Sequence, residues 1–277
     1  MQVKKIAGAL GAEISGLDVA HGLTPDAVAA LREAFLTHLV IFIRGQPLTP
    51  GQFLGFAQAM GQPVEYPFVA GIPGFPHIIE VKKLPHETVN FGGIWHSDTT
   101  YLAQPPMGSL LLAREVPAYG GDTLFANQYL AYEALSDTLK RMLHGLRGIS
   151  SSAKADVSKT REDRIKEHAD PGDAGRQHTY LATHPLVRTH PETGRKSLYA
   201  NVAHTVGIEG MTPEESGPIL GFLFAHQVKP EFTCRFNWTP DCIAFWDNRC
   251  ALHNPVNDYQ GQKRVMLRIT LQGDTPV

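Results

Sequence analysis

The feature that most constrains the fold of this chain is the pair His96 and Asp98, with a third candidate ligand, His253, far downstream. In an extended strand, residues i and i+2 lie on one face, so His96-x-Asp98 presents an imidazole and a carboxylate to the same point. A distant imidazole completes a 2-His-1-carboxylate set, which typically holds non-haem Fe(II) and leaves coordination positions open. His253 is the candidate because it follows an apolar, strand-like run at 242–246. An HxD pair alone is common by chance, so other residues must support this site.

Composition excludes several classes of function. The chain has 277 residues, of which 43% are hydrophobic and 19% charged, and its net charge is −2. This balance is ordinary for a globular protein and gives no electrostatic case for nucleic acid or a membrane surface. No apolar run has the length of a membrane-spanning helix, and no apolar signal core follows the first charges. We therefore expect a cytoplasmic protein with no nucleic-acid or membrane partner.

The pattern of elements predicts one α+β domain over residues 1–277, built on a β-sandwich or jelly roll. Capping residues Thr24, Thr49 and Thr212, each followed by proline, predict helix starts, and a further helix is expected at about 127–146. Apolar or alternating runs predict the strands 8–18, 40–43, 77–81, 109–116, 122–126, 184–189, 197–202, 232–238, 242–246 and 264–271.

A polar segment at about 150–178 has no apolar periodicity. A stretch of this length is either a lid over a site or a plain solvent loop. Both alternatives stay open for its first third, and a solvent loop is favoured for the rest.

The last predicted strand carries two arginines. Arg264 and Arg268 lie four positions apart, hence on one face, whereas Val265, Leu267 and Ile269 occupy the other. Two guanidiniums on an inward face are costly unless each meets an anion, and the planar fork of arginine suits a carboxylate or sulfonate. The alternative is that both arginines point to solvent from an edge strand.

Together these motifs resemble the TauD/TfdA family of Fe(II)- and 2-oxoglutarate-dependent dioxygenases. The resemblance covers nearly the whole chain and rests on His96-x-Asp98, Gly120-Gly121-Asp122-Thr123, Trp246-Asp247-Asn248-Arg249, His253, Arg264 and Arg268. It implies a double-stranded β-helix, that is, a jelly-roll core with flanking helices. It also implies that His96, Asp98 and His253 bind iron, that Thr123 and Arg264 bind the distal carboxylate of 2-oxoglutarate, and that Arg268 contacts an anionic substrate.

The implied reaction hydroxylates a substrate C–H bond with O2 while 2-oxoglutarate is converted to succinate and CO2. The carboxylate of Asp98 favours hydroxylation, because relatives that chlorinate lack it. The implied assembly is a homo-oligomer of two or four chains. The rival reading is a non-redox jelly-roll metalloprotein, either a zinc hydrolase or isomerase or a metal-binding module, which would have no need for Thr123 and Arg264 at this spacing.

The substrate side departs from the pattern of taurine-specific members. Tyr66 and Val69 stand where those members carry His and Tyr, and His204 replaces an expected aromatic residue. The candidate pocket residues, besides Arg268, are Tyr66, Asn201, His204 and Lys154. We therefore expect a small organic anion other than taurine: a larger sulfonate, an alkyl sulfate ester, or an aryloxy or alkyl carboxylate.

Overall fold

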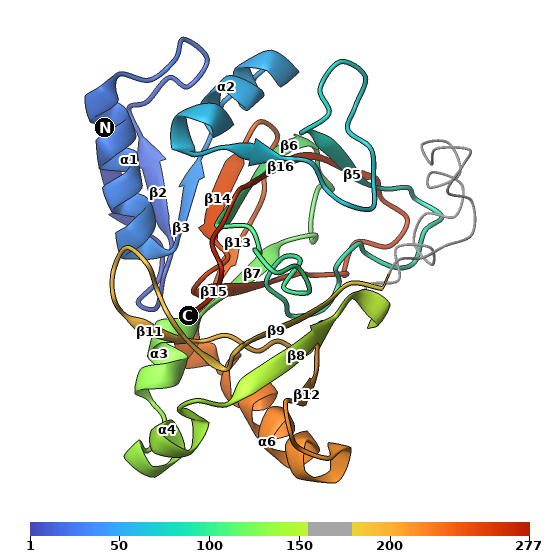
Figure 1. Ribbon diagram of the computed structural model, residues 1–277. Coiled ribbons are helices and arrows are strands. Elements are labelled where there is room, and N and C mark those ends of the chain that lie inside the picture. The colour runs from blue at the N-terminus through green and yellow to red at the C-terminus, as the bar shows by residue number, and fades with distance from the viewer. Residues whose placement is uncertain (155–178) are drawn as a thin grey trace.

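A large antiparallel-rich sheet forms the centre of the computed structural model, which describes residues 1–154 and 179–277 (Figure 1). Its strands, in spatial order, are β1 (Gln2–Lys5), β2 (Ala12–Ser15), β3 (Val40–Ile43), β14 (Ile243–Asp247), β6 (Gly108–Glu115), β16 (Arg264–Leu271) and β4 (Pro63–Val64), and β5 (Ile79–Lys83) also pairs with β16. Only β2 and β3 pair in parallel within this sheet.

Three smaller sheets and five α-helices complete the described chain. The sheets are β13 (Thr233–Phe236), β7 (Thr123–Asn127) and β15 (Ala251–Pro255); β12 (Thr205–Ile208), β8 (Arg147–Ser151) and β9 (Leu181–Pro185); and the hairpin β10 (Val187–Thr189) with β11 (Lys196–Leu198). The α-helices are α1 (Pro25–His38), α2 (Pro50–Met60), α3 (Gln128–Glu133), α4 (Asp137–Leu143) and α6 (Pro213–His226), with short 3-10 helices η1 (Ser152–Lys154) and η2 (Pro230–Phe232).

The large sheet is covered on both faces, and the alternation of β14 shows how. Ile243 and Phe245 pack into one core with residues of α1 and α2, such as Phe35. Ala244 and Trp246 pack into a second core with residues of the β13-β7-β15 sheet. Successive side chains of a strand point to opposite faces, so this apolar run serves two layers at once. The result is a β-sandwich with α1 and α2 outside it (Figure 1).

The same alternation decides where the two arginines of β16 lie. Leu267 and Ile269 belong to the helix-side core, whereas Met266 belongs to the core between the sheets. Arg264 and Arg268 share the parity of Met266, and their residues are only 5% and 6% exposed. The alternative that they face solvent is therefore wrong.

The predicted helix starts are confirmed at atomic detail. Thr24, Thr49 and Thr212 are the N-caps of α1, α2 and α6, and each is followed by proline. Thr49 and Thr212 also form complete capping boxes, in which Gln52 and Glu215 bond back to the cap.

The single helix expected at about 127–146 is wrong. The structure has α3 and α4 there, because Ser136 caps a new helix by accepting a hydrogen bond from the backbone N of Leu139 at 3.3 Å. Met142, an apolar residue within the range of that expected helix, is 47% exposed. Ser136, a polar capping residue within the apolar repeat, therefore starts a second helix where the repeat predicted a continuous one.

Other strand predictions were incomplete. The strand expected at 184–189 is divided into β9, which pairs with β8, and β10, which pairs with β11. Strands β8, β12 and β15 were not expected from the sequence. The polar segment at about 150–178, for which a lid and a solvent loop were the alternatives, lies mostly in 155–178, outside the described residues. Among the described residues, no helix is long and apolar enough to cross a membrane.

Candidate active site

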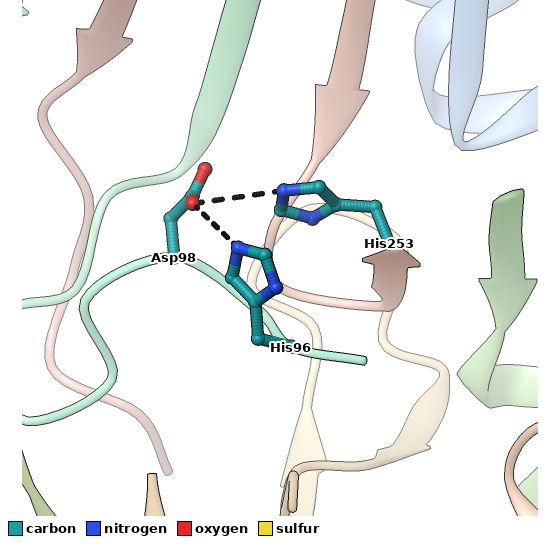
Figure 2. Close-up of side chains that lie close together, drawn as sticks. All are labelled: His96, Asp98 and His253. Carbon is teal, nitrogen blue, oxygen red and sulfur yellow. Dashed lines mark ion pairs between the residues drawn. The ribbon is translucent and has the colours of Figure 1, made fainter. Parts of the chain in front are cut away.

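His96, Asp98 and His253 converge at one point in the interior (Figure 2). The Nε2 atoms of His96 and His253 lie 3.5 and 3.7 Å from Oδ1 of Asp98. All three residues are buried. The two histidines are also backbone partners, since His96 N donates to His253 O at 3.0 Å and His253 N donates to His96 O at 2.8 Å. This isolated bridge joins two segments more than 150 positions apart in the sequence.

The expectation that His96-x-Asp98 lies in a regular strand is wrong. His96 forms only the isolated bridge, and the chain turns at Asp98. Thr99 has φ of 44°, a left-handed conformation that a β-branched residue rarely adopts. The two side chains meet because a turn, rather than strand pleating alone, directs Asp98 toward the imidazoles. Residues with such strained backbone conformations are often found beside functional sites.

The hydrogen bonds of His96 fix its tautomer. Nδ1 lies 2.6 Å from the carbonyl oxygen of Ile94, so Nδ1–H donates there and the lone pair of Nε2 faces Asp98. Burial, together with the neighbouring His96, holds the pKa of His253 well below its usual range. A neutral imidazole is the form in which His253 could bind a metal ion.

Asp98 is held by a hydrogen-bonded network behind the site. Burial alone would raise its pKa, but the charge of Arg268 and the nearby histidines hold the pKa of this carboxyl well below its usual range. Ser109 Oγ donates to Asp98 Oδ2 at 2.6 Å, and Asn248 Nδ2 donates to Ser109 Oγ at 3.0 Å. Trp246 Nε1 in turn donates to Asn248 Oδ1 at 3.0 Å. One carboxylate oxygen is thus fixed, and Oδ1 points toward the imidazoles.

These three residues fit a divalent cation. Two imidazole nitrogens and a carboxylate oxygen, all acceptors, lie within 4.8 Å of one another. Two ligands at right angles on one octahedral ion lie about 3 Å apart, so small side-chain movements would close the observed separations. Gly92 permits this crowding: its φ is 67°, and a Cβ there would lie 2.9 Å from Cε1 of His96.

A second polar region surrounds Arg264. Its guanidinium is buried, and Nε and Nη2 have no hydrogen-bond partner in the described chain. The guanidinium lies 5.7 Å from the Trp238 ring, and Trp238 Nε1 donates to Thr123 Oγ1 at 3.0 Å. Trp238 therefore joins Thr123 and Arg264, the pair expected to hold one carboxylate. Buried guanidinium N–H groups without acceptors indicate an anion-binding site.

The chain matches the model of a protein family described as "Taurine catabolism dioxygenase TauD, TfdA family" over residues 2–270. The chain belongs to this TauD/TfdA family. It is 33% identical over 285 residues to the alpha-ketoglutarate-dependent sulfate ester dioxygenase of Pseudomonas putida. The match covers 100% of this chain and 91% of that protein.

Solved structures show the same relationship. A taurine dioxygenase from Burkholderia xenovorans has a TM-score of 0.82 and 35% identity, covering 100% of this chain and 92% of that one. AAD-2, solved in complex with Mn(II) and N-oxalylglycine, has a TM-score of 0.81 and 29% identity, and the match covers 99% of this chain and 98% of that one. The jelly-roll fold and the class of enzyme predicted from the sequence are confirmed. This TauD/TfdA protein is an Fe(II)- and 2-oxoglutarate-dependent dioxygenase that uses O2.

The structure places the expected substrate residues around the His96–Asp98–His253 cluster. Arg268 Nη2 lies 3.0 Å from Asp98 Oδ1 as an ion pair, without hydrogen-bond geometry. Its guanidinium lies 5.3 Å from the ring centroid of Tyr66, and the ring of His204 lies 6.1 Å from that of His96.

Asn201 is committed to the protein itself. Its Nδ2 donates to Thr100 Oγ1 at 3.2 Å, and its Oδ1 accepts from His204 N at 2.9 Å. A direct contact of Asn201 with substrate stays a prediction. Lys154 ends η1, and its side chain lies outside what the structure describes.

A second group, His190, Asp247 and Cys250, also brings possible metal ligands together. His190 Nδ1 accepts from the backbone N atoms of Glu192 and Thr193 at 3.2 and 3.1 Å, so its proton is on Nε2 and is donated to Asp247 at 3.0 Å. Both ring nitrogens are therefore used. Asp247 also binds Arg249. This group is a structural network that anchors the turn before β15.

Sequence reasoning missed several residues of the site. Ser109 and Trp238 carry no motif in the sequence, and only folding places them against Asp98 and Thr123. Asn248 lies within the quoted Trp246 to Arg249 motif, but its bond to Ser109 depends on β6 and β14 being neighbours. Lys83 is a further buried cation that the sequence analysis did not notice.

Proposed function

We propose that this dioxygenase hydroxylates a C–H bond of a small organic anion, with His96, Asp98 and His253 as the iron ligands. The observation that supports the metal assignment is the convergence of three buried acceptor atoms within 4.8 Å, with hydrogen bonds that orient the side chains of His96 and Asp98. When bound, Fe(II) would activate O2 and so supply the oxidising chemistry. The protein residues bind and orient the reactants and exclude water.

The cosubstrate site is proposed to be the region of Arg264 and Thr123. Arg264 offers two buried N–H groups without acceptors, and the Thr123 hydroxyl oxygen is oriented by Trp238. Since Thr123 Oγ1 accepts from Trp238, its own hydrogen is available for donation. A carboxylate at this point would accept from both residues, as expected for the distal carboxylate of 2-oxoglutarate.

The substrate side is proposed to combine one cation with an apolar wall. A set of aromatic side chains, here called the aromatic cluster, consists of Tyr66, Phe68, Phe91, Tyr101 and Tyr180. Neighbouring rings in it have centroids 5.5 to 6.2 Å apart. Arg268 lies over Tyr66, and the His204 ring, which is close to His96, lies 5.0 Å from Tyr101.

This arrangement favours the binding of an anionic substrate that has an apolar body. Arg268 would bind the head group through its fork, while aromatic rings would contact the rest of the molecule. A sulfonate, an alkyl sulfate ester or an aryloxy or alkyl carboxylate has this form. Taurine, whose amine needs polar partners, is expected to be a poor substrate, since an apolar wall leaves that amine unpaired.

The test is an anaerobic titration of protein loaded with Fe(II) and 2-oxoglutarate, following the visible metal-to-ligand absorption band. Taurine, longer alkyl sulfonates, sulfate esters and aryloxy acids are compared at matched concentration, and succinate formation is then measured in air. The preferred anion should shift the band in wild type and in Arg44→Ala, a control at a partly exposed arginine paired with Glu13. Arg268→Ala should lose that shift. If taurine is the best substrate, or if Arg268→Ala turns over the preferred anion normally, the pocket assignment is wrong.

Three further expectations stay predictions: a cytoplasmic location, a homo-oligomer, and a single domain over residues 1–277. The family match does not favour the rival non-redox metalloprotein.

A further inference from the structure

A second buried cation lies beside Arg264. Lys83 is the last residue of β5 and is the register partner of Arg264 in β16. Directly opposed residues on antiparallel strands point to the same side of the sheet, with Cβ atoms about 5 Å apart. The two residues are 4% and 5% exposed. Both line the same pocket, whose other walls include Asn90, Pro255 and Tyr259.

In the described part of the chain neither cation forms a salt bridge, although the negative charges of Glu87 and Asp122 act on Lys83 and Arg264, respectively. Lys83 Nζ has no hydrogen-bond partner there, as is true of Nε and Nη2 of Arg264. The nearest acidic influence on Lys83 is Glu87, whose carboxylate accepts instead from the backbone N of Leu84 at 2.5 Å. The ammonium lies 4.3 Å from the ring centroid of Tyr259. A cation–π contact offsets only part of the cost of desolvating an ammonium.

The pocket is closed by a set of hydrogen bonds between two segments. Tyr259 OH donates to Asn90 Oδ1 at 2.7 Å, and Asn90 Nδ2 lies 3.3 and 3.1 Å from the carbonyl oxygens of Pro255 and Val256. These bonds join the loop after β5 to the segment after β15. Lys83 therefore lies in a pocket whose wall these hydrogen bonds hold in place, and burial lowers its pKa.

Two like charges in one pocket are stabilised when an anion with several acceptor lone pairs joins them. A carboxylate has two oxygens and can accept from both cations and from a hydroxyl. We propose that Lys83 is a second cation for the distal carboxylate of 2-oxoglutarate, and that Lys83 and Arg264 together select a dicarboxylic 2-oxo acid. This inference rests on the proposed role of Arg264 in cosubstrate binding.

The experiment compares two cosubstrates in matched variants. Lys83→Met removes the charge while keeping a long side chain; Lys263→Met removes a surface lysine that pairs with Glu115 at 2.7 Å and precedes Arg264 in the chain. Dissociation constants for 2-oxoglutarate and for 2-oxopentanoate, which lacks the distal carboxylate, are measured by anaerobic calorimetry with Fe(II). For Lys83→Met we expect affinity for 2-oxoglutarate to fall about 10- to 100-fold, the size of a lost hydrogen bond to a charged group. Affinity for 2-oxopentanoate should change little, and Lys263→Met should match wild type.

Thermal unfolding gives a readout that does not depend on turnover. Without ligand, Lys83→Met should unfold at the wild-type temperature or above it, because an uncompensated buried charge has been removed. The increase in unfolding temperature caused by 2-oxoglutarate should be smaller than in wild type. Lys83→Arg keeps a cation and should retain the preference for the dicarboxylic acid. If Lys83→Met does not fold, Lys83→Gln answers the same question.

The outcomes separate this inference from the proposed function. Unchanged affinity for 2-oxoglutarate in Lys83→Met, or an equal loss for both acids, overturns the role of Lys83 while leaving Arg264 in place. If wild type itself fails to bind 2-oxoglutarate, or if Arg264→Ala binds it normally, the proposed cosubstrate site is wrong.

Discussion

At the scale of single residues, the site depends on side chains that hold the ligands rather than on the ligands alone. Asp98 has one oxygen fixed by Ser109, and Ser109 is itself held by Asn248. His96 is fixed through Ile94. Such outer hydrogen bonds set ligand orientation and commonly affect metal affinity.

Ser109→Ala is expected to weaken Fe(II) binding about 10- to 100-fold, because Asp98 loses the donor that orients its carboxylate. Anaerobic calorimetric titration with Fe(II) measures this. Ser15→Ala, at the exposed end of β2, is the control and should bind like wild type. Equal affinity in the two variants would show that Ser109 does not position Asp98.

Asp247 is a second buried carboxylate, outside the His96–Asp98–His253 cluster. Burial would raise its pKa, but its ion pair with Arg249 and its bond from His190 hold the pKa of Asp247 well below the usual range. Asp247→Asn leaves Arg249 with Glu192 as its remaining carboxylate partner, at 2.6 Å. It should lower the free energy of unfolding by about 1.5 to 3 kcal/mol, the size of lost hydrogen bonds to a charged group, as measured in urea.

The lowered pKa of Asp247 determines how its contribution to the free energy of unfolding changes with pH. A carboxyl with a lowered folded-state pKa stabilises the fold above its unfolded pKa of about 3.9, and this stability is lost as pH falls through the folded pKa. The Asp247→Asn deficit should therefore be constant between about pH 5 and pH 8. A deficit that grows or shrinks across that window would contradict the assigned ionisation.

At the scale of elements, a loop and a strand determine the site together. The loop between β5 and β6 carries His96 and Asp98, and β15 carries His253. The isolated bridge between His96 and His253 joins them, and Gly92 lets the loop pass close to the imidazole.

Gly92→Ala tests this close approach. A Cβ would lie 2.9 Å from His96 Cε1, on a residue with φ of 67°, so the loop must shift and Fe(II) affinity should fall by about tenfold or more. Gly74→Ala is a matched control, because Gly74 has φ of 80° but no atom within 4 Å of the point that a Cβ would occupy. Alanine at a positive φ strains the backbone in both variants, whereas only Gly92→Ala should lose affinity for Fe(II). Equal Fe(II) affinities would indicate that the contact with His96 is unimportant.

At the scale of the whole molecule, the buried side chain of His184 links stability to pH. His184 Nε2–H donates to Leu102 O at 3.0 Å, which joins β9 to the turn after Asp98. Burial lowers the pKa of His184 below its usual value near 6.5. His184 therefore binds a proton more readily in the unfolded chain than in the folded protein.

The consequence is a metal-free protein that is less stable in mild acid. The stability linked to His184 is fully present above its unfolded pKa of about 6.5 and is lost as pH falls through the lower folded pKa. His184→Gln keeps a donor for Leu102 but does not titrate. Its free energy of unfolding, measured in urea from about pH 7 to pH 5, should fall less steeply than that of wild type. Identical slopes would show that His184 does not contribute to acid sensitivity.

The sequence alone determined the features that are local or periodic. Capping residues located the starts of α1, α2 and α6, and the period of two in β16 placed both arginines on one face. Ligand types and spacing selected His96, Asp98 and His253 as candidate metal ligands, and the structure brings these three side chains together. These features could be predicted because each depends on chemistry carried within a few residues or on a characteristic set of donor types.

Only the tertiary structure decided which distant groups meet. Ser136 divided an apparently continuous helix, and the turn at Asp98 replaced an expected strand. Lys83 faces Arg264 because β5 pairs with β16 in one register, and a shift of one residue would point it to the other face. No local pattern encodes that register, since it results from packing two sheets and their helices around shared cores. The pocket lined by Lys83 and Arg264 is therefore a property of the assembled sandwich.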